Sequence, residues 1–212
     1  MKITGAIFDF DGTLFDSMHI WKGIRYKFFD LIGLKLTPED EEAFRGLYLR
    51  ESLILAKERF NLEESYEELF NRFFEYIKSR YLVEAEPKND IIEFLEKLKS
   101  KGVKMGIATA TGESALEAVL EKYGMLHYFS EIYSTYTVGA AKTEPKVYDV
   151  VLEKLGTDKE TTWIFEDALY AATTAKKYGY NVVGIFDKSE ENTKQLEQLA
   201  DYYIHNYSEL DI

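Results

Sequence analysis

Two aspartates, Asp9 and Asp11, flank a single phenylalanine at the end of an apolar run near the N-terminus. Side chains alternate along a strand, so both carboxylates can point the same way while Phe10 packs into the core. Two carboxylates this close repel each other unless a cation or a proton lies between them. The following Gly12 lets the backbone turn tightly and approach a ligand. A plain Asp-Gly turn would explain Asp11 and Gly12 but not Asp9, so the pattern predicts an acidic site.

A second apolar run, at 163–165, ends in Glu166 and Asp167. In a doubly wound sheet this run is expected near the first, which would bring four carboxylates to the same rim. Carboxylate oxygens suit Mg²⁺, which binds through one or two carboxylates together with substrate phosphate. Taken alone, however, two acids at this point would be read as the first turn of a helix, where acids are favoured.

Two further side chains are candidates for contacting a phosphoryl group. Thr109 ends an apolar run, and its hydroxyl and the nearby amides can donate hydrogen bonds. Lys142 precedes a helical pattern and can neutralise phosphoryl oxygens as a point charge. Each residue alone is ordinary surface chemistry, so their weight comes from the acids that they accompany.

Short apolar runs separated by amphipathic stretches predict the elements that position these residues. Strands are expected at 3–10, 103–109, 131–134, 162–165 and 181–186, and 201–205 can add a sixth. Helices are expected at 90–101, 113–123, 146–155 and 168–178. Several of the strand runs are apolar throughout, as in parallel strands that are buried on both faces. The alternation predicts an α/β fold, a doubly wound, Rossmann-like parallel sheet.

Residues 17–83 break this alternation, because only helical periodicity is found there. Apolar side chains between Tyr66 and Tyr81 recur at the spacing of one helix face. Thr37 and Pro38 are typical of an N-cap followed by a proline at the first helical position. The prediction is an inserted all-helical cap domain at 17–83 and a catalytic core made of 1–16 and 84–212.

The amino-acid composition restricts which binding partners and which cellular compartment we expect. The chain has 26 Lys and Arg against 38 Asp and Glu, a formal charge of −12, whereas nucleic-acid binding needs a basic surface. No cysteine is present, which excludes disulfides and thiolate metal sites. Neither a signal peptide nor an apolar run long enough for a membrane span is found. We expect a soluble, cytoplasmic monomer that binds neither nucleic acid nor membranes.

Together, the four chemistry-bearing segments resemble the four motifs of the haloacid dehalogenase superfamily, in the same order and over nearly the whole chain. The Asp-x-Asp-Gly-Thr segment at 9–13 is the most specific of them, and the Lys-x-x-Pro segment at 142–145 and the Glu-Asp pair make chance agreement small. The helical block resembles the cap of the phosphoglycolate phosphatase and β-phosphoglucomutase branch. The segment 45–53 is similar to the part of that cap that faces the active site.

The resemblance implies a magnesium-dependent phosphatase acting on a small phosphorylated metabolite, such as a sugar phosphate. Asp9 would be the nucleophile that forms an aspartyl phosphate, and Asp11 the general acid and then the general base. Thr109 and Lys142 would stabilise charge on the transferred group.

The resemblance also implies a ligand set for Mg²⁺. Asp9, the backbone carbonyl of Asp11 and Asp167 would hold the ion, with Glu166 as a further ligand or a neighbour of the ligands. Residues expected at the substrate are Gly12, Thr13, Ala110, Arg50 and Arg45.

Two alternatives stay open: a phosphomutase of the β-phosphoglucomutase type, and a non-catalytic phosphate-binding module. Thr13 and Trp21 resemble the phosphatases more than the sugar mutases. A haloalkanoate dehalogenase would lack the acid at Asp11, and an oxidoreductase would need a Gly-x-Gly-x-x-Gly segment after the first strand. Departures from the usual motifs at Ala110, Thr143 and Ala171 leave the substrate unspecified.

Overall fold

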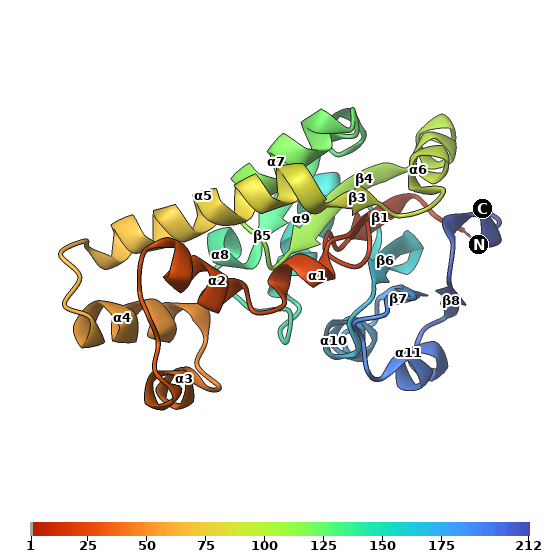
Figure 1. Ribbon diagram of the computed structural model, residues 1–212. Coiled ribbons are helices and arrows are strands. Elements are labelled where there is room, and N and C mark those ends of the chain that lie inside the picture. The colour runs from red at the N-terminus through yellow and green to blue at the C-terminus, as the bar shows by residue number, and fades with distance from the viewer. Residues whose placement is uncertain (1) are drawn as a thin grey trace.

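The computed structural model describes residues 2–212 and contains a sheet of six parallel strands (Figure 1). Across the sheet the order is β5-β4-β1-β6-β7-β8. The strands are β1 (Gly5–Phe8), β4 (Lys104–Thr109), β5 (Glu131–Ser134), β6 (Thr162–Glu166), β7 (Asn181–Ile185) and β8 (Tyr202–Ile204). Strand β1 lies between β4 and β6, so the carboxyl ends of these three strands meet at one edge.

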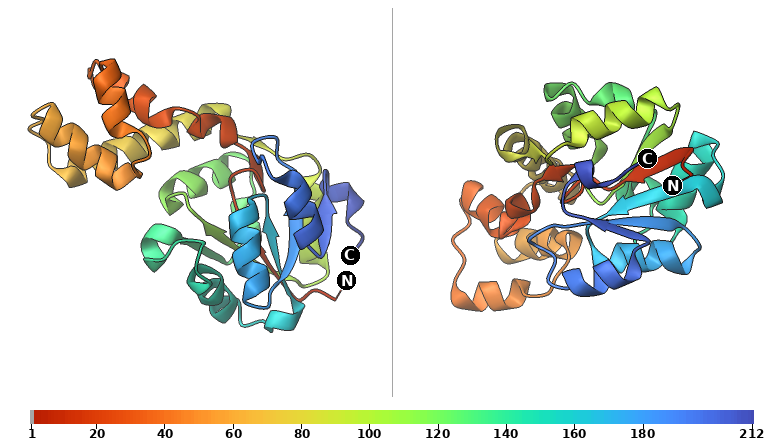
Figure 2. Two further views of the ribbon diagram at one scale, coloured as in Figure 1. Left: turned by 90° about the horizontal axis from the view of Figure 1, so that it is seen from below. Right: turned by 90° about the vertical axis from the view of Figure 1, so that its right-hand side faces the viewer.

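Helices cover both faces of this sheet, as the right-hand view of Figure 2 shows. The helices of the core are α6 (Ile91–Ser100), α7 (Glu113–Lys122), α8 (Thr135–Val138), α9 (Lys146–Leu155), α10 (Leu169–Lys177) and α11 (Thr193–Leu199), with short 3-10 turns at Leu126–Tyr128, Lys159–Thr161 and Tyr207–Glu209. Ala6 and Phe8 pack in the cluster that includes α6 and α7, whereas Ile7 packs in the cluster that includes α9, α10 and α11. The predicted doubly wound fold is therefore confirmed.

An all-helical block leaves the sheet after β1 and extends away from it (Figures 1 and 2). It consists of α1 (Met18–Trp21), α2 (Ile24–Leu31), α3 (Pro38–Phe44), α4 (Leu49–Arg59) and α5 (Tyr66–Glu84). A two-stranded antiparallel ribbon of β2 (Phe15–Asp16) and β3 (Glu86–Pro87) lies where the chain enters and leaves the block. Helix α5 packs against α7 and is the main contact between the block and the sheet layer.

The predicted aromatic stripe of α5 and the predicted cap of α3 are both present. Phe73, Ile77 and Tyr81 of α5 are buried. Thr37 accepts the backbone N–H of Asp40 and forms a capping box, with a proline at the start of the helix.

The first strand is shorter than the predicted 3–10, because it ends at Phe8. The Asp9 N–H still donates to the Phe165 carbonyl at 2.9 Å, but the chain then turns, and the Phe10 carbonyl accepts the N–H groups of Leu14 and Phe15. Strand alternation therefore does not set the directions of the two aspartates; a tight turn does.

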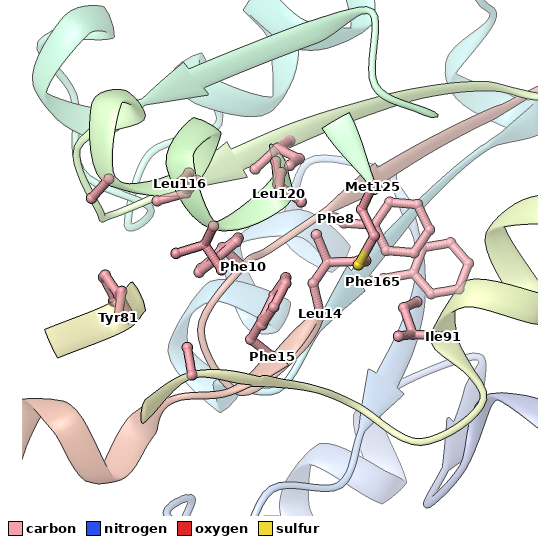
Figure 3. Packing of buried hydrophobic residues seen from close by; sticks show 14 of the residues in the cluster. Phe8, Phe10, Leu14, Phe15, Tyr81, Ile91, Leu116, Leu120, Met125 and Phe165 are labelled. Atoms are coloured by element: carbon pink, nitrogen blue, oxygen red, sulfur yellow. The ribbon is translucent and has the colours of Figure 1, made fainter. Parts of the chain in front are cut away.

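Stacked aromatic side chains in the core hold this turn in place (Figure 3). The rings of Phe8 and Phe165 stack at 4.4 Å, which joins β1 to β6, and the rings of Phe10 and Phe15 stack at 4.6 Å across the turn. All four side chains are fully buried. The turn that contains Asp9 and Asp11 is therefore packed against a rigid apolar core.

Within residues 2–212, no helix combines the length and the apolar character that crossing a bilayer requires.

Candidate active site

The predicted site residues meet at the carboxyl edge of the sheet. Asp9 follows β1, Asp167 follows β6, and Thr109 is the last residue of β4. A pocket of about 280 Å³ opens above Asp9, Asp11 and Asp167. Parallel α/β sheets bind ligands in this place, beyond the strand ends and where the strand order reverses.

Lys142 is the buried cation of the site, with only 2% of its side chain exposed. Its Nζ lies 2.6 Å from Asp9 Oδ1 and 2.8 Å from Glu166 Oε2. Burial alone would lower the pKa of Lys142, but the charges of Asp9 and Glu166 outweigh burial and raise the pKa well above its ordinary value. Lys142 is therefore a fixed positive charge directly beside the proposed nucleophile.

The carboxylates of Asp9, Glu166 and Asp167 form a cluster in which one oxygen of each lies within 4.8 Å of the others. Burial, and next the charge of Glu166, raise the pKa of Asp9 to about 7, although Lys142 opposes this shift. The same two causes raise the pKa of Asp167. The single ammonium of Lys142 therefore does not neutralise the cluster. A divalent ion with a preference for oxygen ligands fits this donor set.

Glu166 is held mainly by the protein. Its Oε2 accepts Lys142 and, at 3.3 Å, the hydroxyl of Tyr148, while its Oε1 accepts the backbone N–H of Ala168 at 3.2 Å. A fully buried carboxylate with these partners is better suited to orienting Lys142 and the ligand residues than to binding the ion directly.

Gly12 and Thr13 set the position of Asp167. Gly12 has a φ of +76°, and a Cβ at this position would collide with the Asp167 carboxylate. The Thr13 hydroxyl donates to Asp167 Oδ1 at 2.9 Å. The structure shows their contacts with Asp167, and their predicted contact with the substrate stays a prediction.

Three hydroxyl groups surround Asp11. Ser17 donates to Oδ1 at 2.6 Å, Thr111 donates to Oδ2 at 2.6 Å, and the Tyr81 hydroxyl also donates to Oδ1. Burial raises the pKa of Asp11, and these three hydrogen bonds oppose that shift. Burial and the charge of Asp11 also raise the pKa of Tyr81 well above its usual value, so the phenol stays a proton donor.

Sequence reasoning did not find these three hydroxyl groups. In the sequence Tyr81 belongs to the apolar face of a helix, and neither Ser17 nor Thr111 lies in a motif that indicates contact with Asp11. A second Thr two residues after Thr109 was the one available signal, since a strand-end loop can present both.

The remaining candidates differ in where they lie. Ala110 lines the pocket, and Thr109 is fully buried with its Oγ1 accepting the Thr111 N–H at 3.0 Å. Arg45 is exposed and pairs with Glu42 at 2.8 Å. Arg50 is exposed on α4 and lies over the ring of Tyr66, 5.8 Å from its centre. The structure does not bring either arginine to the acidic cluster, so their contact with substrate stays a prediction.

Comparison with known proteins adds independent information. A family model described as haloacid dehalogenase-like hydrolase matches residues 6–185. The phosphorylated carbohydrates phosphatase of Thermotoga maritima is 26% identical over 193 residues, which cover 91% of this chain and 89% of that protein. Fructose-1-phosphate phosphatase YqaB of Escherichia coli is 25% identical over 200 residues, 87% of this chain and 97% of that protein.

Among solved structures, CbbY from Rhodobacter sphaeroides in complex with phosphate superposes with a TM-score of 0.79. The match covers 98% of this chain and 96% of that one, at 19% identity. At this identity the likeness concerns the fold alone.

Proposed function

The chain belongs to the haloacid dehalogenase-like hydrolases, and from this premise we propose that it is a phosphatase that hydrolyses a small phosphorylated metabolite through an aspartyl phosphate. The observation that carries the proposal is the site itself: Asp9, Asp11 and Asp167 line one pocket, and a buried lysine lies 2.6 Å from Asp9. The curated relatives named above are phosphatases, which supports the reaction class.

In the proposed reaction, an Asp9 carboxylate oxygen attacks phosphorus as the bond from phosphorus to the leaving oxygen breaks. Asp11 gives its proton to that oxygen, so the product leaves as a neutral alcohol. Asp11 then accepts a proton from a water molecule whose oxygen attacks phosphorus and releases Asp9. Lys142 supplies a positive charge next to the transferred group throughout.

Asp9, Asp167 and the backbone carbonyl of Asp11 are the groups that would hold Mg²⁺. When bound, the ion would neutralise the acids and the phosphoryl oxygens. We infer that the helical block at 17–83 acts as a cap over the pocket, since Met18 and Trp21 from α1 already form part of the pocket wall.

Mg²⁺ is expected to raise the melting temperature by roughly 5–10 °C at about 100 times its Kd, because it binds only the folded site. Asp167→Asn should abolish this shift, whereas Asp158→Asn, at an exposed acid before β6, should leave it intact. Thermal unfolding with Mg²⁺ and with EDTA measures both, alongside phosphate release from a panel of metabolites. An unchanged shift in Asp167→Asn would place the ion elsewhere.

The pocket wall favours a leaving group without charge. Met18, Trp21, Tyr136 and Tyr170 line it above the acids, and aromatic faces of this kind pack well against the C–H face of a sugar. Burial, followed by the charge of Glu166, raises the pKa of Tyr170 to about 12, so its hydroxyl stays neutral and can hydrogen-bond a sugar hydroxyl.

Fructose 1-phosphate is therefore expected to be a better substrate than fructose 1,6-bisphosphate. The second phosphate would lie against the uncharged wall of the pocket, where a charge without a partner costs several kcal/mol, so kcat/KM should fall at least about tenfold. Steady-state kinetics on this pair measures the effect. Equal turnover would mean that a cation of the helical block reaches the substrate, in which case Arg50→Ala should restore the preference.

A further inference from the structure

Tyr81 links the helical block to the acid of the proposed reaction. Its side chain is fully buried, and its hydroxyl donates to Asp11 Oδ1 across 70 positions of sequence. Trp21 of α1 donates its indole N–H to the same hydroxyl oxygen at 2.8 Å. Helix α5 therefore reaches Asp11 directly through Tyr81, and α1 supports that contact through Trp21.

The direction of this hydrogen-bond chain is fixed by chemistry. An indole N–H can only donate, so the Tyr81 oxygen accepts from Trp21. The single Tyr81 proton is directed to Asp11 Oδ1, which lies closer than its other possible acceptor, Thr111 Oγ1 at 3.3 Å. Ser17 donates to the same Oδ1, so this oxygen already accepts two hydrogen bonds. Oδ2 has one such partner, Thr111 at 2.6 Å, which makes Oδ2 the less engaged oxygen and the favoured one for the proton that Asp11 transfers. A threonine hydroxyl can rotate to accept that proton's hydrogen bond.

Packing does not require the Tyr81 hydroxyl. The ring contacts Phe10 edge-on at 5.8 Å and Trp21 at 6.4 Å, and a phenylalanine would keep both contacts. The hydroxyl is the part of the side chain that is directed at Asp11.

We propose that Tyr81, held by Trp21, is a positioning residue that orients the Asp11 carboxyl for proton transfer to the leaving group. This assignment rests on the proposed phosphatase function. It implies that acid catalysis needs α5 in place, and so ties the chemistry to the position of the helical block.

The test compares two esters that differ in how much they need an acid. Phenyl phosphate releases a basic phenolate that requires a proton, whereas p-nitrophenyl phosphate releases a stabilised anion that does not. Because kcat/KM covers only the steps up to departure of the leaving group, it isolates the proton transfer. Tyr81→Phe should lower kcat/KM for phenyl phosphate about 10- to 100-fold, which is part of the roughly 10²- to 10⁴-fold that general acid catalysis contributes. The value for p-nitrophenyl phosphate should change less than about threefold, and KM should stay similar for both.

Tyr180→Phe is the matched control. Tyr180 is also buried, and its hydroxyl donates to a carboxylate, Asp149, at 2.6 Å on another part of the core. Its loss should leave the ratio of the two esters unchanged. Trp21→Phe removes the indole N–H together with part of a ring that lines the pocket, and it should shift the ratio of the two esters in the same direction as Tyr81→Phe, but less.

The results distinguish a failure of the role assigned to Tyr81 from a failure of the proposed phosphatase function. A loss in Tyr81→Phe that is equal for both esters, or no loss at all, would overturn the assignment and leave the phosphatase intact. Wild-type protein that, with Mg²⁺, releases phosphate from neither ester and from no metabolite of the panel would refute the proposed function, and the assignment with it.

Discussion

Asp9→Asn is expected to lower phosphate release by on the order of 10⁵-fold or more while the protein stays folded, since loss of a covalent nucleophile is among the largest single-residue effects. The amide cannot displace the leaving oxygen. Glu166 also contacts Lys142 and belongs to the acidic cluster, but it is fully buried and does not line the pocket, so it cannot replace Asp9 as the nucleophile. Phosphate release from the best substrate, with Mg²⁺ present, measures the loss. Residual activity near that of the wild type would remove Asp9 from the role of nucleophile.

The same variant is expected to be more stable than the wild type at pH 8 in EDTA. The pKa of Asp9 is raised to about 7 in the folded protein, so its neutral form favours folding at low pH and its ionisation destabilises the fold as pH rises. Asparagine is neutral at every pH and avoids this cost. The difference in unfolding free energy between Asp9→Asn and the wild type should become smaller as the pH falls through 7 toward 4. Urea unfolding at both pH values measures it.

Asp187→Asn is the control for this stability argument. Asp187 is a buried acid whose partner, Lys88, lies at 2.6 Å and lowers its pKa, against the effect of burial. Its neutralisation should therefore reduce stability at pH 8, the opposite sign to Asp9→Asn, and should leave turnover nearly unchanged.

Much of the fold was predictable because its signals are local. Uninterrupted apolar runs mark buried parallel strands, and the Thr37-Pro38 cap and the α5 stripe depend on residues within a few turns of each other. The one clear error, a first strand extended to Phe10, arose because Phe10 adds one more apolar residue after the run that ends at Phe8. The turn that follows this run depends on aromatic packing with Phe15, which periodicity does not report.

The site was predictable only where residue type alone restricts the chemistry. Acids at strand ends and a lysine before a helix were enough to nominate Asp9, Asp167 and Lys142. The Tyr81 hydroxyl was not predictable, because an aromatic residue on an apolar helix face looks the same whether its hydroxyl meets water or a carboxylate. The placement of Arg50 depends on how the helical block sits on the core, which no local pattern encodes.

Lys142→Met is expected to affect stability and activity together. Without the ammonium, Asp9 and Glu166 lose their shared partner in a buried place, and breaking such a pair from one side typically costs about 3–5 kcal/mol of unfolding free energy. Phosphate release should also fall by about 10²- to 10³-fold, as when one charge-stabilising donor is removed from a site. Urea unfolding in EDTA and phosphate release with Mg²⁺ measure the two effects.

Adding Mg²⁺ distinguishes the contribution of Lys142 to stability from its contribution to catalysis. A divalent ion held by Asp9 and Asp167 would compensate the buried charges, so it should stabilise Lys142→Met more than it stabilises the wild type. Turnover should stay low, because the ion cannot occupy the position of the ammonium. Lys88→Met, which breaks the Lys88–Asp187 pair of the core, should lose stability that Mg²⁺ does not restore and should keep its activity. If Lys142→Met were as stable as the wild type in EDTA, the three acids would not be charged together in the folded protein, and the argument for a cation at their centre would fail.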